Sequence, residues 1–205
     1  MFICLTGIDG CGKSTHIRLL KDRFLAENGK HAEILSVWDI TRDSRYHSHS
    51  FISDPHAIHR YLASLSSPAR LLFIMHALIE SWETIGKKNP DIVLAEGYWY
   101  KYAFSELLHS GNSDFIEKSL SGFPIPDLVI ALDASPEEIW ERKPSVTLYE
   151  CGFRSPSQES FVSFQSKLRK KMFEYAQIKR WSVVNVNRPA SEVSADIWNL
   201  MEKGE

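Results

Sequence analysis

Residues 2–15 read Phe-Ile-Cys-Leu-Thr-Gly-Ile-Asp-Gly-Cys-Gly-Lys-Ser-Thr, and this stretch decides the fold. An apolar run leads into the pattern G-x-x-x-x-G-K-[ST], and residues 16–20 continue as an amphipathic helix. This order of strand, loop and helix is that of a phosphate-binding P-loop. The alternative is a glycine-rich turn that arises by chance, and the correct flanking elements argue against it.

The residue types in the loop suit the phosphates of a nucleoside triphosphate. Glycines let backbone N–H groups face inward around an anion, and the positive end of the following helix points to the same place. We expect Lys13 to reach the β- and γ-phosphates of ATP and the Ser14 hydroxyl to hold Mg²⁺. The predicted nucleotide-binding residues are Gly7, Asp9, Gly10, Cys11, Gly12, Lys13, Ser14 and Thr15.

Composition and charge describe one ordinary globular domain, residues 1–205, with 43% hydrophobic residues. A net charge of −2 gives no electrostatic reason for nucleic acid or a membrane surface as a partner. The three cysteines show no metal-site spacing, and their odd number gives no disulfide framework. The N-terminus lacks the layout of a signal peptide, and no apolar run approaches the length of a membrane span. We therefore expect a cytoplasmic protein.

Strand and helix patterns alternate along the chain. The predicted strands are 2–6, 32–38, 91–95, 127–132 and 181–186, and the predicted helices are 13–28, 55–65, 68–86, 100–109, 136–142, 158–178 and 190–201. This order predicts an α/β fold, a five-stranded doubly wound parallel sheet with helices on both faces. Helix 68–86 is apolar on most faces and is expected to be buried. Ligands of such sheets bind at the carboxyl ends of the strands.

Two acidic residues follow predicted strands. Glu96 ends the third strand, where a carboxylate can support a metal-bound water or accept a proton from a phosphate acceptor. The alternative is a solvated acid, but the apolar strand before it favours the functional interpretation. Asp133 ends the fourth strand in the same way, and helix capping explains it at least as well.

Four stretches of the chain resemble the thymidylate kinases. Residues 7–15 are similar to the P-loop of that family, including an acid at the position of Asp9, and residues 126–138 look like its fourth strand and the helix behind it. Glu96-Gly97-Tyr98 occupies the place of its Asp-Arg-Tyr signature, and residues 71–73 align with the start of its long central helix. The resemblance implies a three-layer P-loop kinase fold with a lid over ATP. It also implies transfer of the γ-phosphoryl group to a deoxynucleoside monophosphate, with Asp9 facing the acceptor sugar and Tyr98 lining the acceptor pocket.

The cations of the acceptor site depart from the pattern of the family. Gly97 stands where the signature arginine binds the acceptor phosphate, and a second arginine on the central helix falls near His76-Ala77. Because a phosphate dianion needs cationic ligands, other residues must supply the charge, or the acceptor is different. Sequence order offers Arg42, Arg45, Arg70 and Lys101 as candidates. Lys101 lies about one helical turn beyond Tyr98, and the alternative for it is a solvated helix lysine.

Residues 143–156 form the predicted lid. Arg142, Lys143 and Arg154 are positioned to neutralise charge on the transferring group, with Arg142 and Arg154 as the candidate catalytic arginines. The alternative is an ordinary polar loop. Histidines 47, 49, 56 and 59 lack the closed ligand set of a zinc site, so we expect a polar segment over the acceptor pocket instead.

Two other functions remain open at this point. One is a P-loop kinase for another acceptor, a nucleoside or a modified nucleotide, which would not need the missing arginines. The other is a nucleotide-binding protein without catalysis, which Lys13, Ser14 and Glu96 argue against. We expect ATP and a small phosphate acceptor as partners and leave a homodimer open.

Overall fold

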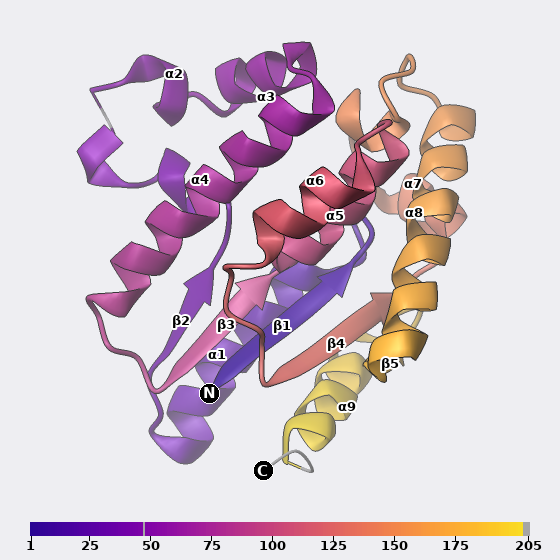
Figure 1. The fold of residues 1–205 in the computed structure, drawn as a ribbon. Coiled ribbons are helices and arrows are strands. Elements are labelled where there is room, and N and C mark those ends of the chain that lie inside the picture. Colours follow the sequence, from indigo (N-terminus) through magenta and orange to yellow (C-terminus); the bar gives the residue numbers. More distant parts are fainter. Residues whose placement is uncertain (47, 203–205) are drawn as a thin grey trace.

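The computed structural model describes residues 1–46 and 48–202 of the chain (Figure 1). Within these residues, five parallel strands form one sheet in the order β2-β3-β1-β4-β5. The strands are β1 (Phe2–Gly7), β2 (Ala32–Leu35), β3 (Ile92–Glu96), β4 (Leu128–Asp133) and β5 (Ser182–Asn185). β1 lies at the centre and is buried along its whole length, so the loop that follows it emerges from the middle of the sheet.

Helices cover both faces of the sheet. They are α1 (Lys13–Asn28), α2 (Ser50–Ser53), α3 (Pro55–Ser64), α4 (Ser67–Gly86), α5 (Tyr98–Leu108), α6 (Ser113–Leu120), α7 (Pro136–Arg142), α8 (Gln158–Lys179) and α9 (Ala190–Glu202), with short 3-10 turns η1 (Asp39–Thr41), η2 (Ser44–Tyr46) and η3 (Tyr149–Cys151). α1 and α9 pack on one face, and α4, α5 and α8 pack on the other (Figure 1). The predicted doubly wound α/β fold is confirmed.

Local signals explain why α1 has the predicted bounds. Its buried residues Ile17, Leu20 and Phe24 recur at helical spacing and face the sheet. The helix ends at Gly29, which is left-handed with φ of 61° and whose N–H donates to the Leu25 carbonyl. This is the common glycine C-cap.

Several predicted bounds differ from the structure. β2 ends at Leu35 rather than at residue 38, because the Ser36 N–H donates to the Asp39 carboxylate and the Ser36 carbonyl accepts from the Ser81 hydroxyl. α4 is less buried than expected, with Leu72 and Ile79 about half exposed on one side. α6 was not predicted from the sequence, although Asn112 caps it by accepting from the Phe115 N–H.

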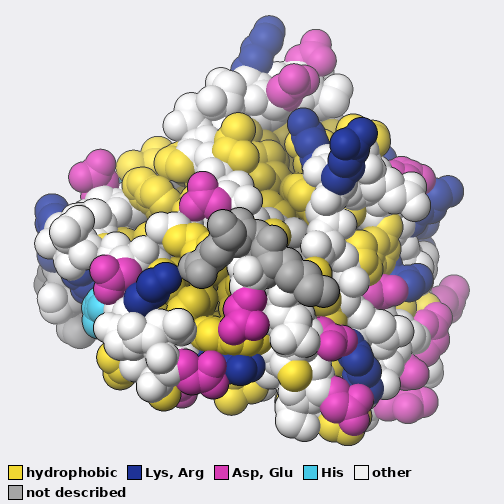
Figure 2. All heavy atoms as spheres, turned by 90° about the horizontal axis from the view of Figure 1, so that it is seen from below, with side chains coloured by type: hydrophobic (Ala, Val, Ile, Leu, Met, Phe, Trp, Pro, Cys, Tyr) yellow, Lys and Arg dark blue, Asp and Glu magenta, His cyan; other side chains and the backbone are white. Residues whose placement is uncertain are grey.

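The two ends of the sheet carry different surface features. The carboxyl ends of the strands carry the P-loop and face the top of Figure 1. The opposite end, seen in Figure 2, shows acidic and basic side chains interspersed with apolar ones rather than gathered by sign. Among the helices of the described residues, none is long and apolar enough to cross a membrane.

Candidate active site

A cavity of about 800 Å³ opens at the carboxyl ends of the central strands. Its walls come from the P-loop, from the segments after β2 and β3, from α3, α4 and α5, and from the segment that follows α7. The acidic and basic residues that line it are Asp9, Lys13, Arg42, Arg70, Glu96, Lys101, Lys143 and Glu150. The cavity therefore brings together residues that lie far apart in the sequence.

The P-loop is closely packed at Gly7 and has polar groups at its centre. A Cβ on Gly7 would lie 2.5 Å from the Cys11 sulfur and 2.8 Å from the Leu132 carbonyl oxygen, so this close approach requires glycine. Lys13 folds back into the loop, where its ammonium donates to the carbonyls of Gly7 at 3.0 Å and Ile8 at 2.8 Å. Gly12 precedes α1 without a side-chain cap, which leaves backbone N–H groups at the helix start for an anion.

The side chains of Ser14 and Glu96, the two predicted Mg²⁺ residues, are in contact. β1 pairs with β3 so that Leu5 lies beside Glu96, and the Ser14 hydroxyl donates to the Glu96 carboxylate. These hard oxygen donors suit Mg²⁺, which prefers oxygen ligands and keeps several waters. The described residues contain no cluster of three His, Cys, Asp or Glu side chains that could hold a metal ion. A cation here would therefore depend on Ser14, Glu96, water and phosphate oxygens.

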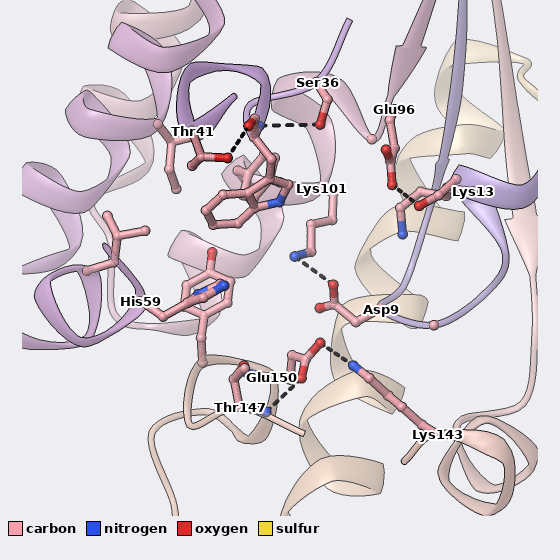
Figure 3. A pocket seen from close by; sticks show the side chains of 18 of the residues that line it. Asp9, Lys13, Ser36, Thr41, His59, Glu96, Lys101, Lys143, Thr147 and Glu150 are labelled. Atoms are coloured by element: carbon pink, nitrogen blue, oxygen red, sulfur yellow. Dashed lines mark hydrogen bonds and ion pairs between the residues drawn. The ribbon is translucent and has the colours of Figure 1, made fainter. Parts of the chain in front are cut away.

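Asp9 and Lys101 form an ion pair inside the cavity. Their Oδ1 and Nζ atoms are 2.8 Å apart, and the side chains are 16% and 8% exposed. Figure 3 shows the two side chains pointing toward each other, with the Lys143–Glu150 pair close by. Burial opposes the ionisation of Asp9, but the ammonium groups of Lys101, Lys13 and Lys143 outweigh it and lower the pKa of Asp9 below its ordinary value. Lys101 is therefore a cavity residue and not a solvated helix lysine.

Gln165 is a polar residue of the site that was not predicted from the sequence. It lies on α8 with no exposed surface. Its side chain accepts from the Asp9 N–H at 3.1 Å and donates to the Glu150 carbonyl at 2.9 Å. The signal in the sequence was a glutamine on the same helix face as Phe161, Phe164 and Leu168, which are all buried. A polar residue on an apolar face calls for a partner.

The guanidinium of Arg70 is hydrogen-bonded to other residues of the protein. It donates to both carboxylate oxygens of Glu106, at 2.7 and 2.9 Å, and to the carbonyls of Leu62 and Leu65. The side chains of Arg70 and Glu106 are 3% and 0% exposed. Tyr149 also donates to Glu106, at 3.0 Å. Although Arg70 borders the cavity, this geometry argues against the predicted role as an acceptor ligand.

Tyr98 lies away from the cavity, contrary to the expectation from the resemblance. Its ring is 1% exposed, packs edge-on against Phe2, and its hydroxyl donates to the Pro124 carbonyl at 2.9 Å. Gly97 and Tyr98 both have positive φ, 71° and 48°, and this sharp corner turns the ring into the core. Tyr102, one turn further along α5, lines the cavity instead.

The far end of the cavity is aromatic and apolar. Trp38 and His59 pack with ring centroids 4.8 Å apart and ring planes tilted by 45°, and Ile74 and Tyr102 also line the cavity. Burial lowers the pKa of His59, so its imidazole favours the neutral form near neutral pH. Of the histidines weighed from the sequence, His59 lines the cavity, while His47 lies outside the described residues. The neutral flat rings at this end suit a heterocycle better than an anion.

Residues of the predicted lid border the cavity. Lys143 pairs with the Glu150 carboxylate, which also accepts from the Thr147 N–H at 2.7 Å. Arg142 is exposed and donates to the Gly10 carbonyl of the P-loop at 3.0 Å. Arg154 is also exposed and is not among the residues that line the cavity. Lys143 is thus the lid cation that faces the site.

Two further candidates have clear positions. Arg42 follows η1 and lines the cavity beyond β2. Burial raises the pKa of the half-buried Asp39, and the charge of Arg42 partly offsets this effect. Asp133 accepts from Arg169 at 2.6 and 2.8 Å, whereas Ser135 caps α7 by accepting from the Glu138 N–H. The capping interpretation of Asp133 was therefore wrong, and Asp133 anchors α8 to the end of β4.

The chain was compared with known proteins over its whole length. No protein-family model matches the chain. The chain is 28% identical to a probable thymidylate kinase of Methanothermobacter thermautotrophicus, in an alignment that covers 98% of this chain and 94% of the relative. It is 22% identical to a thymidylate kinase of Dictyostelium discoideum, over 98% of this chain and 85% of the relative.

Solved structures give the same result for the fold. The thymidylate kinase of Candida albicans superimposes with a TM-score of 0.65 at 19% identity, covering 98% of this chain and 91% of the other. That of Ehrlichia chaffeensis superimposes with a TM-score of 0.65 at 16% identity, covering 98% of each chain. The resemblance predicted from the P-loop and the strand ends is confirmed.

Proposed function

We propose that this chain, a relative of the thymidylate kinases over nearly its whole length, transfers the γ-phosphoryl group of ATP to a nucleoside monophosphate. One observation carries the proposal. The P-loop, the Ser14–Glu96 contact and the Asp9–Lys101 pair all open onto a single cavity. Phosphoryl transfer needs this combination, because donor and acceptor must be held in line in one water-excluding site.

The P-loop end of the cavity would hold the triphosphate. Backbone N–H groups of the loop and of the α1 start would surround the phosphates, and the Lys13 ammonium would leave the Gly7 and Ile8 carbonyls to contact the β- and γ-phosphates. Ser14 and Glu96 would hold Mg²⁺. When bound, this cation neutralises charge that develops on the phosphate oxygens.

The other end of the cavity would hold the acceptor. Because the pKa of Asp9 is lowered, its carboxylate is ionised at neutral pH and can accept a hydrogen bond from a sugar hydroxyl. Lys101 would supply a point charge for an acceptor phosphate, and Arg42 would add a second cation at the rim. The aromatic wall around Trp38 and Tyr102 would take the base. Glu96 lies between the two ends and would support the attacking oxygen.

We also propose that residues 1–205 act as one domain in which 143–156 is a lid. Closure would keep water away from the transferring group, so that the phosphoryl group reaches the acceptor instead of being hydrolysed. Because ATP and nucleoside monophosphates are cytoplasmic metabolites, we propose the cytoplasm as the compartment. A homodimer remains a prediction, which light scattering tests.

The proposal is tested by ADP release from ATP and Mg²⁺ with thymidine monophosphate as acceptor. Lys13→Ala should lower turnover by about 100-fold or more, because the loop loses its cation at the transferring group. Lys170→Ala is the matched control, since Lys170 is 78% exposed on α8. Wild-type turnover by a correctly folded Lys13→Ala variant would rule out this mechanism.

A second candidate, a kinase for an uncharged nucleoside, is favoured by one observation. At the acceptor end, Lys101 is matched by Asp9, Arg70 by Glu106 and Lys143 by Glu150. Gly97 adds no charge where the family carries an arginine. An acceptor without phosphate would leave these pairs intact. The same assay with thymidine in place of its monophosphate decides between the two, because the preferred acceptor shows the higher kcat/KM.

A further inference from the structure

We propose that Gln165 is a positioning residue that couples the lid to the P-loop. It would hold the Asp9 carboxylate toward the acceptor and keep residues 143–156 closed over the cavity during transfer. The inference rests on the proposed function, and it adds a residue that neither the P-loop motif nor the family resemblance identifies.

The hydrogen bonds of Gln165 fix its amide in one orientation. The Asp9 N–H at 3.1 Å must be met by the side-chain oxygen, and the Glu150 carbonyl at 2.9 Å must be met by the side-chain NH₂. The same NH₂ group lies 3.4 Å from Asp9 Oδ2. Rotation of the amide by half a turn would place like groups against both backbone partners. The side chain therefore acts as a rigid link between the two segments.

The partners of Gln165 lie in elements that are remote in sequence. Asp9 is 156 residues away in the P-loop, and Glu150 is 15 residues away in the lid. A side chain needed only for packing at this position would be apolar, as Phe161, Phe164 and Leu168 on the same face are. Burying an amide without partners costs about 1–3 kcal/mol, so its presence here depends on these bonds.

The charge pattern explains why a neutral amide is required. Lys101, Asp9, Gln165, Glu150 and Lys143 contact one another in that order from α5 to the end of α7. Gln165 thus separates two acidic residues, each neutralised by its own lysine. A carboxylate in place of the amide would add a third negative charge between them and would lose the donor to the Glu150 carbonyl.

The consequence for the reaction is a link between acceptor orientation and lid position. If the hydrogen bond from Gln165 to the Glu150 carbonyl breaks, the lid is no longer linked to Asp9 through Gln165. Water then gains access to the transferring group, and hydrolysis of ATP competes with transfer. If the contact of Gln165 with Asp9 breaks, Lys101 alone holds the Asp9 carboxylate, and the orientation of the carboxylate toward the acceptor becomes less well defined.

The test compares Gln165→Met with Gln177→Met. Both variants make the same chemical change on α8, but Gln177 is exposed. In Gln165→Met we expect transfer to the acceptor to fall about tenfold or more, and the ratio of acceptor-independent ATP hydrolysis to transfer to rise by a similar factor. The KM for the acceptor should rise more than the KM for ATP. Gln177→Met should match the wild type.

A readout independent of activity is hydrogen exchange of peptides that cover residues 143–156. We expect faster exchange in Gln165→Met than in the wild type, and no change in Gln177→Met. If Gln165→Met does not fold, Gln165→Asn is used, since it stays neutral and polar but is one methylene too short to reach both Asp9 and Glu150.

The failure of this proposal can be told apart from the failure of the proposed function. A wild-type protein that transfers no phosphoryl group contradicts the proposed function, while the exchange experiment still tests the link. Unchanged lid exchange, or a loss of transfer and hydrolysis in equal proportion, would overturn the role of Gln165.

Discussion

Arg70 offers the sharpest test of how the cavity wall is built. The structure indicates that Arg70 holds the chain together rather than binding the acceptor, since both oxygens of Glu106 and the carbonyls of Leu62 and Leu65 use its N–H groups. In Arg70→Met, Glu106 would remain fully buried without its bidentate partner, and the Tyr149 hydroxyl would still donate to it. Breaking one side of a buried ion pair costs about 3–5 kcal/mol.

That loss is large against the stability of a typical domain, about 5–15 kcal/mol, and urea unfolding near pH 7 measures it. The double variant Arg70→Met/Glu106→Leu should recover part of the loss, because no uncompensated charge is left buried. Arg70→Lys should fall between wild type and Arg70→Met, since a lysine keeps the charge but not the bidentate geometry. Unchanged stability of Arg70→Met, together with a raised KM for the acceptor, would contradict this structural role and show that Arg70 binds the acceptor.

The remaining predictions concern the cavity and the base of the lid. Glu96→Gln keeps the contact with Ser14 but removes the charge, so turnover should fall about 100-fold while ATP affinity measured by calorimetry changes little; equal turnover at saturating Mg²⁺ would make Glu96 a bystander. Lys101→Met should raise the KM for a monophosphate acceptor about tenfold more than the KM for a nucleoside, because both lose the support of Asp9 but only the monophosphate loses a phosphate contact; equal effects on both acceptors would contradict the phosphate role. His109 is stacked on Phe164, and burial, together with the charges of Arg70 and Lys101, lowers the pKa of its imidazole to about 3. The wild-type protein should therefore lose stability as the pH falls below about 6.5, by at most about 1.4 kcal/mol per pH unit. Urea unfolding near pH 7 and near pH 5 should give a flatter dependence for His109→Phe, and identical slopes would show that His109 does not titrate in this way.

The sign of the His109 effect follows from the two states. The folded protein keeps the imidazole neutral down to about pH 3, whereas the unfolded chain protonates it near the ordinary value of 6.5. Below that value the unfolded state binds more protons, and the equilibrium shifts toward unfolding. The stability contributed by neutral His109 is therefore fully present above about pH 6.5. It is lost progressively in acid.

Local features of the sequence were enough to predict the elements that carry the nucleotide site. The glycine pattern and the apolar run before it located β1 and the P-loop, and Gly29 marked the end of α1. The sequence also placed Ser14 at the start of the helix after β1 and Glu96 at the end of β3, and the two side chains are in contact in the structure. Each of these predictions depends on a few neighbouring residues and on one general rule of parallel sheets.

The acceptor end could not be predicted in the same way. Whether Arg70 binds a ligand or a buried acid depends on Glu106, which is 36 residues away and lies on another helix. Gln165 has the same dependence on Asp9. The side toward which Tyr98 points depends on backbone angles at a corner, and aromatic composition does not reveal them. Long-range pairing and left-handed backbone are the two kinds of information that residue types alone do not carry.

The corner at Gly97 and Tyr98 sets the angular phase of α5 about its own axis. Each residue of an α-helix advances by about 100°, so the direction of Lys101 is counted from this corner. Inserting or deleting one residue between Tyr98 and Lys101 would leave the sheet untouched, yet it would turn the ammonium away from Asp9 and bring another side chain to face the P-loop. The positive φ at Gly97 also disfavours an arginine at this position. The obstacle is the backbone conformation and not space, because a Cβ there would make only ordinary contacts. The acceptor preference of this protein should therefore change more readily through insertion or deletion of one residue in α5 than through an arginine at position 97.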